Sequence, residues 1–195
     1  MDHQGAQEHI IEMMRTGLPD TLRYHALDHT LDVMTSAEKI GLAEDIGDEA
    51  METLLTAAAY HDCGFIRTYE NHEEMSCKIA AEILPDYGFQ PNDIKVIQEM
   101  IMSTRVPQAS DTHLGRILCD EDLHYLGGPA YERISTGLLN ELTLNGFDLS
   151  YRQWLDVQIG FLESHQFWTD FCIKTYSTQK AKTLERLKTE REQLS

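Results

Sequence analysis

The sequence has few cysteines, and none of them pair in a way that would bind zinc. Four cysteines occur among 195 residues, and no two of them form a CxxC motif. Scattered thiols of this kind are typical of a cytosolic protein with reduced side chains, and they argue against a disulfide framework. The four residues are Cys63, Cys77, Cys119 and Cys172. We therefore expect a cytoplasmic protein without a cysteine zinc site.

Long apolar segments are also absent from the sequence. No apolar run approaches the roughly 20 residues that a helix needs to cross a bilayer. The first residues, Met1–Gln4, lack the basic start and the apolar stretch that mark a signal peptide. The sequence therefore predicts neither a membrane span nor export.

Basic residues are scarce. Sixteen lysines and arginines stand against 33 aspartates and glutamates, which gives a formal net charge of −17. Such a field repels long nucleic acids and anionic membranes. It does not exclude a small phosphorylated substrate, because a bound metal ion reverses the local potential. The charge thus restricts the size of an anionic partner and says little about the chemistry of the site. The sequence leaves open whether the chain forms a homo-oligomer.

No segment shows the alternation of apolar and polar residues that is typical of a half-buried strand. Apolar residues recur instead at helical spacing between proline and glycine breaks. A chain of 195 residues can bury one substantial core. The sequence predicts one all-α domain with about seven to nine helices. The expected helices cover residues 1–17, 26–40, 49–60, 72–84, 91–105, 111–125, 131–144, 149–176 and 179–194.

The most informative stretch is Ala57–Asp62. Three alanines are followed by a tyrosine and by an adjacent histidine and aspartate, His61 and Asp62. The alanines indicate a buried helix, and two polar side chains at the end of a buried helix are costly unless both have partners. A divalent metal would be a partner for both. Neighbouring residues diverge by about 100° on a helix, so they share an ion only where the helix ends. Gly64 makes an end at this point plausible.

Two other patterns supply candidate ligands. His25 and His29 are spaced so that both imidazoles lie on one face of a helix. Asp120 follows an apolar lead-in and is followed by two more acidic residues, Glu121 and Asp122. A carboxylate beneath an apolar stripe would be a natural fourth ligand, although the same cluster could be an acidic helix cap. Taken alone, an HxxxH pair is more often a pair of surface or core histidines.

In order along the chain these residues resemble the motif of the HD-domain metal-dependent phosphohydrolases. The matching segments read YHALDHT around His29, AAAYHDCGF around His61 and Asp62, and ILCDEDLHYLG around Asp120. The resemblance implies an HD-type helical bundle, with a motif region over about residues 20–130 and trailing helices over 131–195. It implies one divalent metal held by His29, His61, Asp62 and Asp120. Asp122 is the alternative ligand, because many members of the family have an alanine before the aspartate, a pattern that Glu121–Asp122 could imitate.

The same resemblance implies hydrolysis of a phosphomonoester or a phosphodiester in a small, nucleotide-like substrate, with Asp62 at the catalytic centre. The metal would be Mn, Fe, Co, Ni, Zn or Mg, because histidine and carboxylate ligands suit all of them. A cyclic-nucleotide phosphodiesterase is an alternative, as is an HD module that binds metal without turnover. A di-iron oxygenase would need more histidines.

Three further residues have candidate roles. His25 matches in position the histidine that protonates the leaving group in cyclic-nucleotide phosphodiesterases, and a structural histidine is the alternative. His72 resembles the extra histidine of dinuclear family members, but Ser103–Arg105 stands where those proteins have another histidine. His72 could then bind substrate or cap a helix. Arg105 is a candidate phosphate clamp, or a partner in a salt bridge.

Overall fold

The computed structural model describes residues 1–194, and within them every regular element is helical. Nine α-helices and three short 3₁₀ turns follow one another without a strand in this range, which confirms the all-α prediction. The α-helices are α1 (His3–Gly17), α2 (Leu27–Ala43), α3 (Asp48–Tyr60), α4 (His72–Ile83), α5 (Pro91–Ser103), α6 (His113–Leu123), α7 (Tyr131–Leu144), α8 (Tyr151–Ser164) and α9 (Asp170–Gln193). The 3₁₀ turns are η1 (Cys63–Ile66), η2 (Leu84–Tyr87) and η3 (His124–Gly127).

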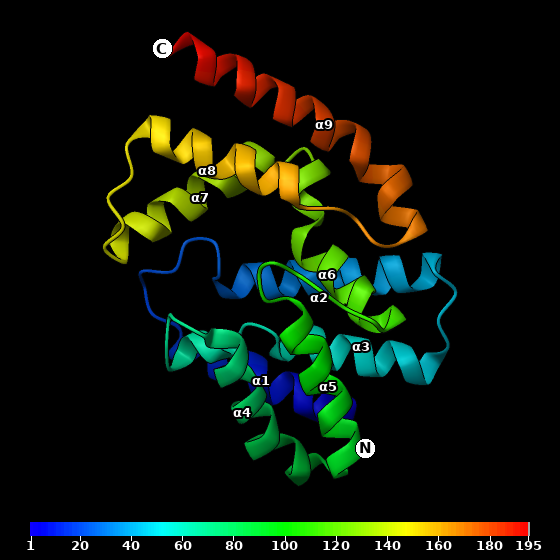
Figure 1. Cartoon of the computed structure of the whole chain (residues 1–195). Coiled ribbons are helices and arrows are strands. Elements are labelled where there is room, and N and C mark those ends of the chain that lie inside the picture. The colour runs from blue at the N-terminus through cyan, green and yellow to red at the C-terminus, as the bar shows by residue number, and fades with distance from the viewer. Residues whose placement is uncertain (195) are drawn as a thin grey trace.

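Helix α3 is the centre of the larger group of helices. It contacts α1, α2, α5 and α6, and α4 and α5 pair beside it (Figure 1). Its second half, Ala57–Tyr60, is completely buried. Short alanine side chains allow neighbouring helices to approach closely, so this segment packs on several sides at once. The expectation of a buried helix that ends at a histidine and an aspartate is confirmed.

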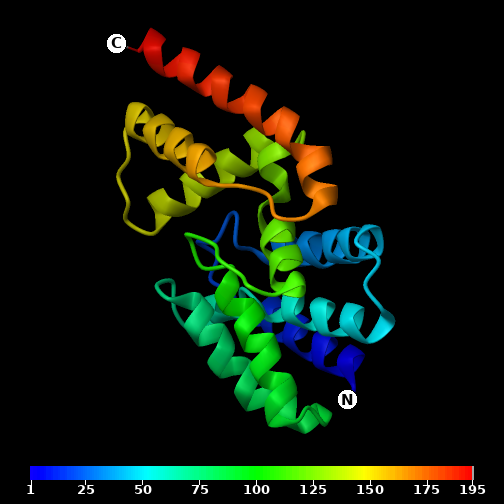
Figure 2. The ribbon, with the colours of Figure 1, turned by 45° about the vertical axis from the view of Figure 1, so that its right-hand side comes forward.

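Helices α7, α8 and α9 form a second layer on one side of this group (Figures 1 and 2). Helix α6 and the η3 turn lead into the layer, and α9 contacts both η3 and α8. The far half of α9 buries only Thr183 and Leu187, so it packs along one edge. None of the helices in residues 1–194 has both the length and the apolar composition needed to cross a bilayer.

The predicted helices over residues 149–176 and 179–194 are wrong in the position of the break between them. The chain leaves the helix after Ser164, runs extended, and starts again at Asp170, and α9 then continues without a break to Gln193. The break has a physical cause. The Thr169 hydroxyl caps α9 by accepting a hydrogen bond from the Cys172 amide, and the buried Asp120 carboxylate accepts from the amides of Trp168 and Thr169. Free amides at a helix start are satisfied in this way.

Candidate metal centre

The end of α3 turns His61 and Asp62 toward the same point. Helix α3 stops at Tyr60, and Asp62 already precedes the η1 turn. Gly64 packs directly against the start of α4, where a Cβ atom would overlap the carbonyl oxygen of His72. Its amide donates a 2.8 Å hydrogen bond to Ser76 Oγ on α4. The backbone of α4 therefore approaches closer here than any side chain would allow.

Four donor atoms from three helices converge at this point. His29 Nε2, on the first turn of α2, lies 3.2 Å from Asp122 Oδ1 and 3.5 Å from Asp62 Oδ2. His61 Nε2 lies 3.3 Å from Asp62 Oδ2, 3.4 Å from His29 Nε2 and 3.8 Å from Asp122 Oδ1. Ligands at about 2.1 Å from one divalent ion are separated from one another by ~3.0–3.4 Å. The five distances that involve a histidine nitrogen lie within that range or just above it.

The hydrogen bonds around these residues fit a cation at their centre. His61 Nδ1 is 2.7 Å from the carbonyl oxygen of Ala58 and donates to it. This bond leaves the lone pair of Nε2 facing the other donors, as in other metal-ligating histidines. Asp62 Oδ2 is buried and has no hydrogen-bond partner among the described residues. Buried unpaired carboxylate oxygens are costly, and a metal ion would supply the missing partner.

The electrostatics of the cluster indicate the same need for positive charge. Burial lowers the pKa of His61, but the negative charges of Asp62 and Asp122 outweigh burial and raise it to about 9. Burial raises the pKa of Asp62, but the positive charges of His61 and His25 hold it well below its usual range. Without a metal a proton balances the carboxylates, and a divalent cation would replace that proton.

The structure corrects the predicted fourth ligand. Asp120 is fully buried, but its carboxylate points to the α8–α9 connection, where it accepts from Trp168 N at 2.9 Å and from Thr169 N and Oγ1 at 2.8 and 2.7 Å. Residues two apart on a helix point in directions about 200° apart, so Asp120 and Asp122 cannot serve the same site. The cluster that could hold an ion consists of His29, His61 and Asp122, with Asp62 beside it. Asp120 anchors the start of α9.

Gln108 holds the Asp122 carboxylate in position. Its Nε2 donates a 3.0 Å hydrogen bond to Asp122 Oδ2, which leaves Oδ1 turned to the two histidines. Gln108 lies in the segment between α5 and α6, next to Pro107. Outer partners of this kind orient a ligating carboxylate. The sequence contained no signal for this role.

His25 lies beside the cluster and is held by a buried carboxylate on α7. Its Nδ1 is 2.5 Å from Glu141 Oε1, and Glu141 Oε2 accepts from the amides of Arg23, Tyr24 and His25 at 2.8, 2.8 and 3.0 Å. The Tyr69 hydroxyl also donates to Oε1. His25 Nε2 is then the ring nitrogen that remains for a ligand. The structure thus places His25 at the site but does not use it as part of the cluster.

The pKa values of this pair move in opposite directions. Burial lowers the pKa of His25, but the hydrogen bond to Glu141 and the negative charges around it raise it above its ordinary value. Burial raises the pKa of Glu141, but the bonds and the charge of His25 and the backbone amides lower it to about 2. Glu141 therefore stays ionised near neutrality. It was missed in the sequence, where the only signal is an acidic residue on the apolar stripe of Ile134, Leu138 and Leu142.

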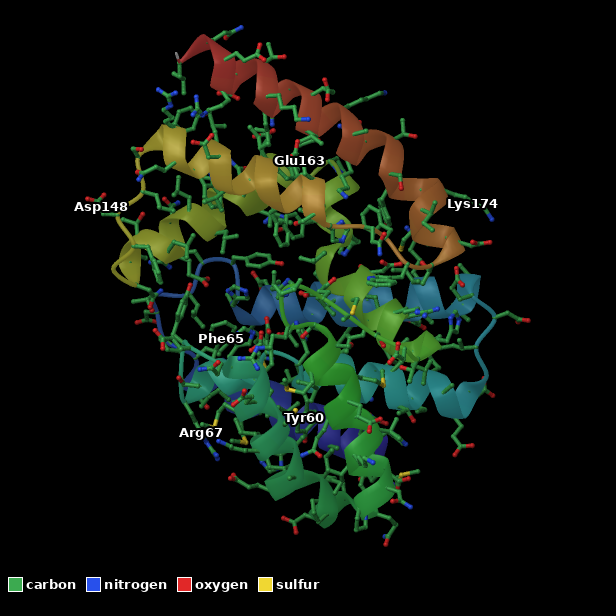
Figure 3. The ribbon with its side chains drawn as sticks, in the orientation of Figure 1. Tyr60, Phe65, Arg67, Asp148, Glu163 and Lys174 are labelled. Carbon is green, nitrogen blue, oxygen red and sulfur yellow. The ribbon has the colours of Figure 1, made fainter. Side chains whose placement is uncertain are left out.

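His72 borders the cluster on the side of α4. Its Nε2 lies 3.3 Å from Asp62 Oδ1, the oxygen that faces away from His61 and His29. The ring of Phe65 stacks on His72 at 4.0 Å and on His25 at 4.5 Å between ring centroids. Figure 3 labels Phe65 between the ribbons of α2 and α4. His25 lies two residues before α2, and His72 is the first residue of α4. The η1 turn thereby fixes the spacing of His25 and His72.

Arg105 is not at the site. Its guanidinium donates to Glu74 Oε1 at 2.9 Å and to Asn71 Oδ1 at 2.6 Å, and the side chain is 42% exposed. Arg105 does not line the cavity described below. The geometry matches the salt bridge that was the alternative for this residue, and it differs from the predicted phosphate clamp.

A cavity of about 270 Å³ opens next to the cluster. One wall holds the polar residues His25, Asp62, His72 and Asp122. The opposite wall comes from α7 and α8 and is apolar, with Trp154 as its largest member. Concave sites with an apolar body and a few convergent polar groups are typical of small-molecule binding. The donor cluster therefore lies at one end of a space that a small ligand can enter.

The profile of the HD domain matches residues 26–123, about half of the chain, and this range contains His29, His61, Asp62 and Asp122. The chain is an HD-domain protein. The match begins just before α2 and ends with α6, so it covers the helices that carry the cluster. Helix α1 and the layer of α7, α8 and α9 lie outside the matched range.

Two other proteins are similar to this HD-domain protein. An uncharacterized protein of Clostridium beijerinckii is 38% identical over 84 residues, which are 42% of this chain and 53% of that protein. The chain thus spans about half the length of that relative. The crystal structure of a predicted HD superfamily hydrolase from an uncultured Thermotogales bacterium has a TM-score of 0.62 at 21% identity. The likeness covers 96% of this chain and 92% of the other, and it includes the α7–α9 layer.

Proposed function

We propose that this HD-domain protein is a divalent-metal-dependent phosphohydrolase that cleaves a phosphomonoester or phosphodiester bond in a small substrate. The observation that carries the proposal is that the Nε2 atoms of His29 and His61 lie 3.4 Å apart at the end of a cavity, each within 3.2–3.8 Å of a carboxylate oxygen of Asp62 and of Asp122. The crystal structure of a predicted HD superfamily hydrolase with the same fold supports a hydrolytic reaction. The full chemistry requires one metal ion and one water molecule.

His29, His61, Asp62 and Asp122 would hold the metal. When bound, a divalent ion lowers the pKa of a water molecule and neutralises negative charge on the phosphoryl oxygens. This role also compensates for the net charge of −17, because phosphate would otherwise meet a strongly negative protein. No lysine or arginine lines the cavity among residues 1–194, so the metal and the histidines carry the attraction for phosphate.

His25 is the proposed general acid. As the water oxygen bonds to phosphorus and the bond from phosphorus to the leaving oxygen breaks, His25 Nε2 donates its proton to that oxygen. The ionised Glu141 stabilises the protonated ring through Nδ1 and keeps Nε2 turned toward the substrate. Asp62 Oδ1, which faces the cavity side at 3.3 Å from His72, would take the proton that the attacking water loses. A positioned acid of this kind contributes about 10²–10⁴-fold to a rate.

The test combines metal content with turnover. Purified protein should bind about one divalent ion per chain, and the Mn²⁺- or Co²⁺-loaded protein should release phosphate from at least one of a panel of phosphomonoesters, nucleotides and cyclic nucleotides. Asp62→Ala should lose both properties, while Asp148→Ala, in the exposed α7–α8 loop, should keep both. Bound metal without turnover on any of the esters would favour the inactive HD module.

Cyclic-nucleotide hydrolysis is a second form of the same proposal. It is favoured by the position of His25, whose Nε2 is available to a leaving oxygen within the cavity that holds Asp62 and Asp122. A phosphodiesterase would cleave cyclic nucleotides faster than the corresponding monoesters. The reverse preference would assign the enzyme to the phosphomonoesterases.

A further inference from the structure

The wall of the cavity that faces the metal centre is almost entirely hydrocarbon. Helix α7 contributes Leu138 and Leu142, and α8 contributes Trp154, Val157 and Phe161. Leu138, Leu142 and Phe161 are only half-buried, and Val157 is 49% exposed although it lies on the same wall. These side chains belong to the layer outside the matched HD range, so this chain has built the wall with its own C-terminal helices.

The charges around the cavity oppose a second anionic group on the ligand. Glu73 and Asp122 line it, and among the described residues no lysine or arginine does. Both of these acidic residues lie at the metal end, since Asp122 belongs to the donor cluster and Glu73 is beside His72. A phosphate, sulfate or carboxylate far from the metal would therefore meet hydrocarbon and no cationic partner. Moving an unpaired anion into such a place is strongly unfavourable. The cavity thus accepts one anionic group, at the metal end only.

The polar groups within the apolar wall form one hydrogen-bonded set, made of the hydroxyls of Tyr131 and Ser135 and the amide of Gln158. The side chain of Gln158, on α8, is 8% exposed, and its Oε1 accepts hydrogen bonds from Tyr131 at 2.8 Å and from Ser135 at 2.5 Å. With the amide oxygen engaged in this way, no described residue accepts from the Nε2 group. Because Gln158 lines the cavity, the free donor can mark one acceptor on an otherwise apolar ligand.

We infer that the group esterified to phosphate in the substrate is uncharged and mainly apolar, and that it lies against α7 and α8 while its single phosphate lies at the metal centre. The inference rests on the proposed function and narrows it. It excludes nucleoside di- and triphosphates, sugar bisphosphates and phosphorylated carboxylic acids as substrates, because each of them carries a second anionic group. One hydrogen-bond acceptor on the apolar group would meet Gln158.

Binding of non-hydrolysable phosphonates tests this inference without relying on turnover. The Mn²⁺-loaded protein is titrated by calorimetry with methyl-, propyl- and hexylphosphonate, and with a six-carbon phosphonate that ends in a carboxylate. Each buried CH₂ group should tighten binding by about threefold to fourfold. The terminal carboxylate should weaken binding at least tenfold relative to hexylphosphonate. Equal affinity for all four compounds, or tighter binding of the carboxylate, would overturn the inference.

Substitutions in α7 and α8 test where the alkyl chain of the phosphonate binds. Leu142→Gln and Val157→Gln should each weaken hexylphosphonate binding about fivefold to tenfold and leave methylphosphonate unchanged, because only the longer ligand reaches them. Leu144→Gln is the matched control, since Leu144 is 51% exposed on the same helix and lies outside the cavity. Val157 is half exposed, so its variant should fold even if Leu142→Gln does not. Unchanged hexylphosphonate affinity in Val157→Gln would contradict the assigned position.

Turnover distinguishes the failure of this inference from the failure of the proposed function. Along methyl, propyl, hexyl and phenyl phosphate, kcat/KM should rise, while nucleoside monophosphates and glycerol phosphate should be poorer substrates than phenyl phosphate. Turnover that favours the polar esters would refute the apolar substrate and keep the phosphohydrolase. Graded phosphonate binding without turnover of any ester would refute the phosphohydrolase and keep the apolar ligand.

Discussion

Glu141 is the residue whose replacement tests the architecture of the site most broadly. Its carboxylate receives three backbone amides from the segment before α2, together with His25 Nδ1 and the Tyr69 hydroxyl. In Glu141→Gln the shape is preserved, but one oxygen becomes an NH₂ group. An NH₂ group cannot accept a hydrogen bond. In one orientation of the amide the three backbone amides lose their acceptor, and in the other His25 Nδ1 and the Tyr69 hydroxyl lose theirs. A buried donor without a partner costs about 1–3 kcal/mol.

The magnitude of the stability loss follows from the same contacts. The pKa of Glu141 is lowered from 4.5 to about 2 in the folded protein. A difference of this size corresponds to about 3 kcal/mol of stability at neutral pH, because one pKa unit is about 1.4 kcal/mol. We therefore expect Glu141→Gln to reduce the free energy of unfolding by about 2–3 kcal/mol at pH 7.

The stability difference between wild type and Glu141→Gln should depend on pH in a direction that follows from the pKa values of Glu141 and His25. A carboxylate with a depressed pKa in the folded state stabilises the protein above its unfolded pKa and loses that contribution as the pH falls through the folded pKa. Glu141 also raises the pKa of His25, and the stability that this adds is present below the unfolded pKa of about 6.5 and is lost as the pH rises through the folded pKa. The difference in unfolding free energy between wild type and Glu141→Gln should therefore be largest at about pH 5–6 and decrease toward higher pH. It should shrink as the pH falls from about 4.5 toward 2.

Urea unfolding at several pH values measures this difference, with Glu132→Gln on the exposed face of the same helix as the control. The control should change stability by less than about 1 kcal/mol. Glu141→Gln should also keep its metal and lose rate with poor leaving groups, because His25 loses the charge that stabilises its protonated form. Equal stability of Glu141→Gln and Glu132→Gln, or a difference from wild type that grows as the pH falls below about 4.5, would refute this reasoning.

Three further predictions concern neighbours of the cluster. Gln108→Leu removes the hydrogen bond to Asp122 Oδ2 and should weaken metal binding about 10–100-fold in a chelator competition assay. His25→Ala should retain stoichiometric metal by elemental analysis and slow only esters with poor leaving groups; loss of the metal would mean that His25 is a ligand. Gly64→Ala should lower the thermal midpoint through a loss of ~1–3 kcal/mol, because its Cβ meets the His72 carbonyl. Gly160→Ala on α8, which has open space around it, should not.

The parts of the fold that depend on local sequence could be predicted. Helix α3 and its end at His61 follow from alanines, a glycine and two polar residues within a short stretch, and helical spacing placed His29 on the first turn of α2. Propensity and burial act over a few residues, so such features are readable without the rest of the chain. The order of the HD motif then joined three separate segments.

The parts that depend on how helices pack could not be predicted. Both Asp120 and Asp122 lie on α6, and only the rotation of α6 against α2 and α3 decides which one faces the histidines. For Arg105 the sequence leaves a phosphate clamp and a salt bridge open, and the folded chain decides between them by bringing Glu74 to it. Glu141 is separated from Arg23 by 118 positions. Contacts at such separations leave no local pattern.

The break between α8 and α9 has the same origin. The sequence of residues 164–170 contains no proline or glycine that would end a helix. The carboxylate of Asp120 on α6 instead receives the amides of Trp168 and Thr169 and stabilises the extended connection. A residue expected to bind metal therefore determines where a distant helix starts. The wrong assignment of Asp120 as a ligand and the missed break between α8 and α9 therefore have one cause, the hydrogen bonds between Asp120 and this connection.

The most direct test of the central claim is the metal content of two matched variants, Asp122→Asn and Asp120→Asn. Elemental analysis after dialysis against a single divalent metal, followed by chelator competition, measures both stoichiometry and affinity. Wild type and Asp120→Asn should each hold about one ion per chain, with Asp120→Asn less stable because the start of α9 loses its anchor. Asp122→Asn should fold normally and lose the ion. Retained metal in Asp122→Asn together with loss in Asp120→Asn would contradict the four-residue centre.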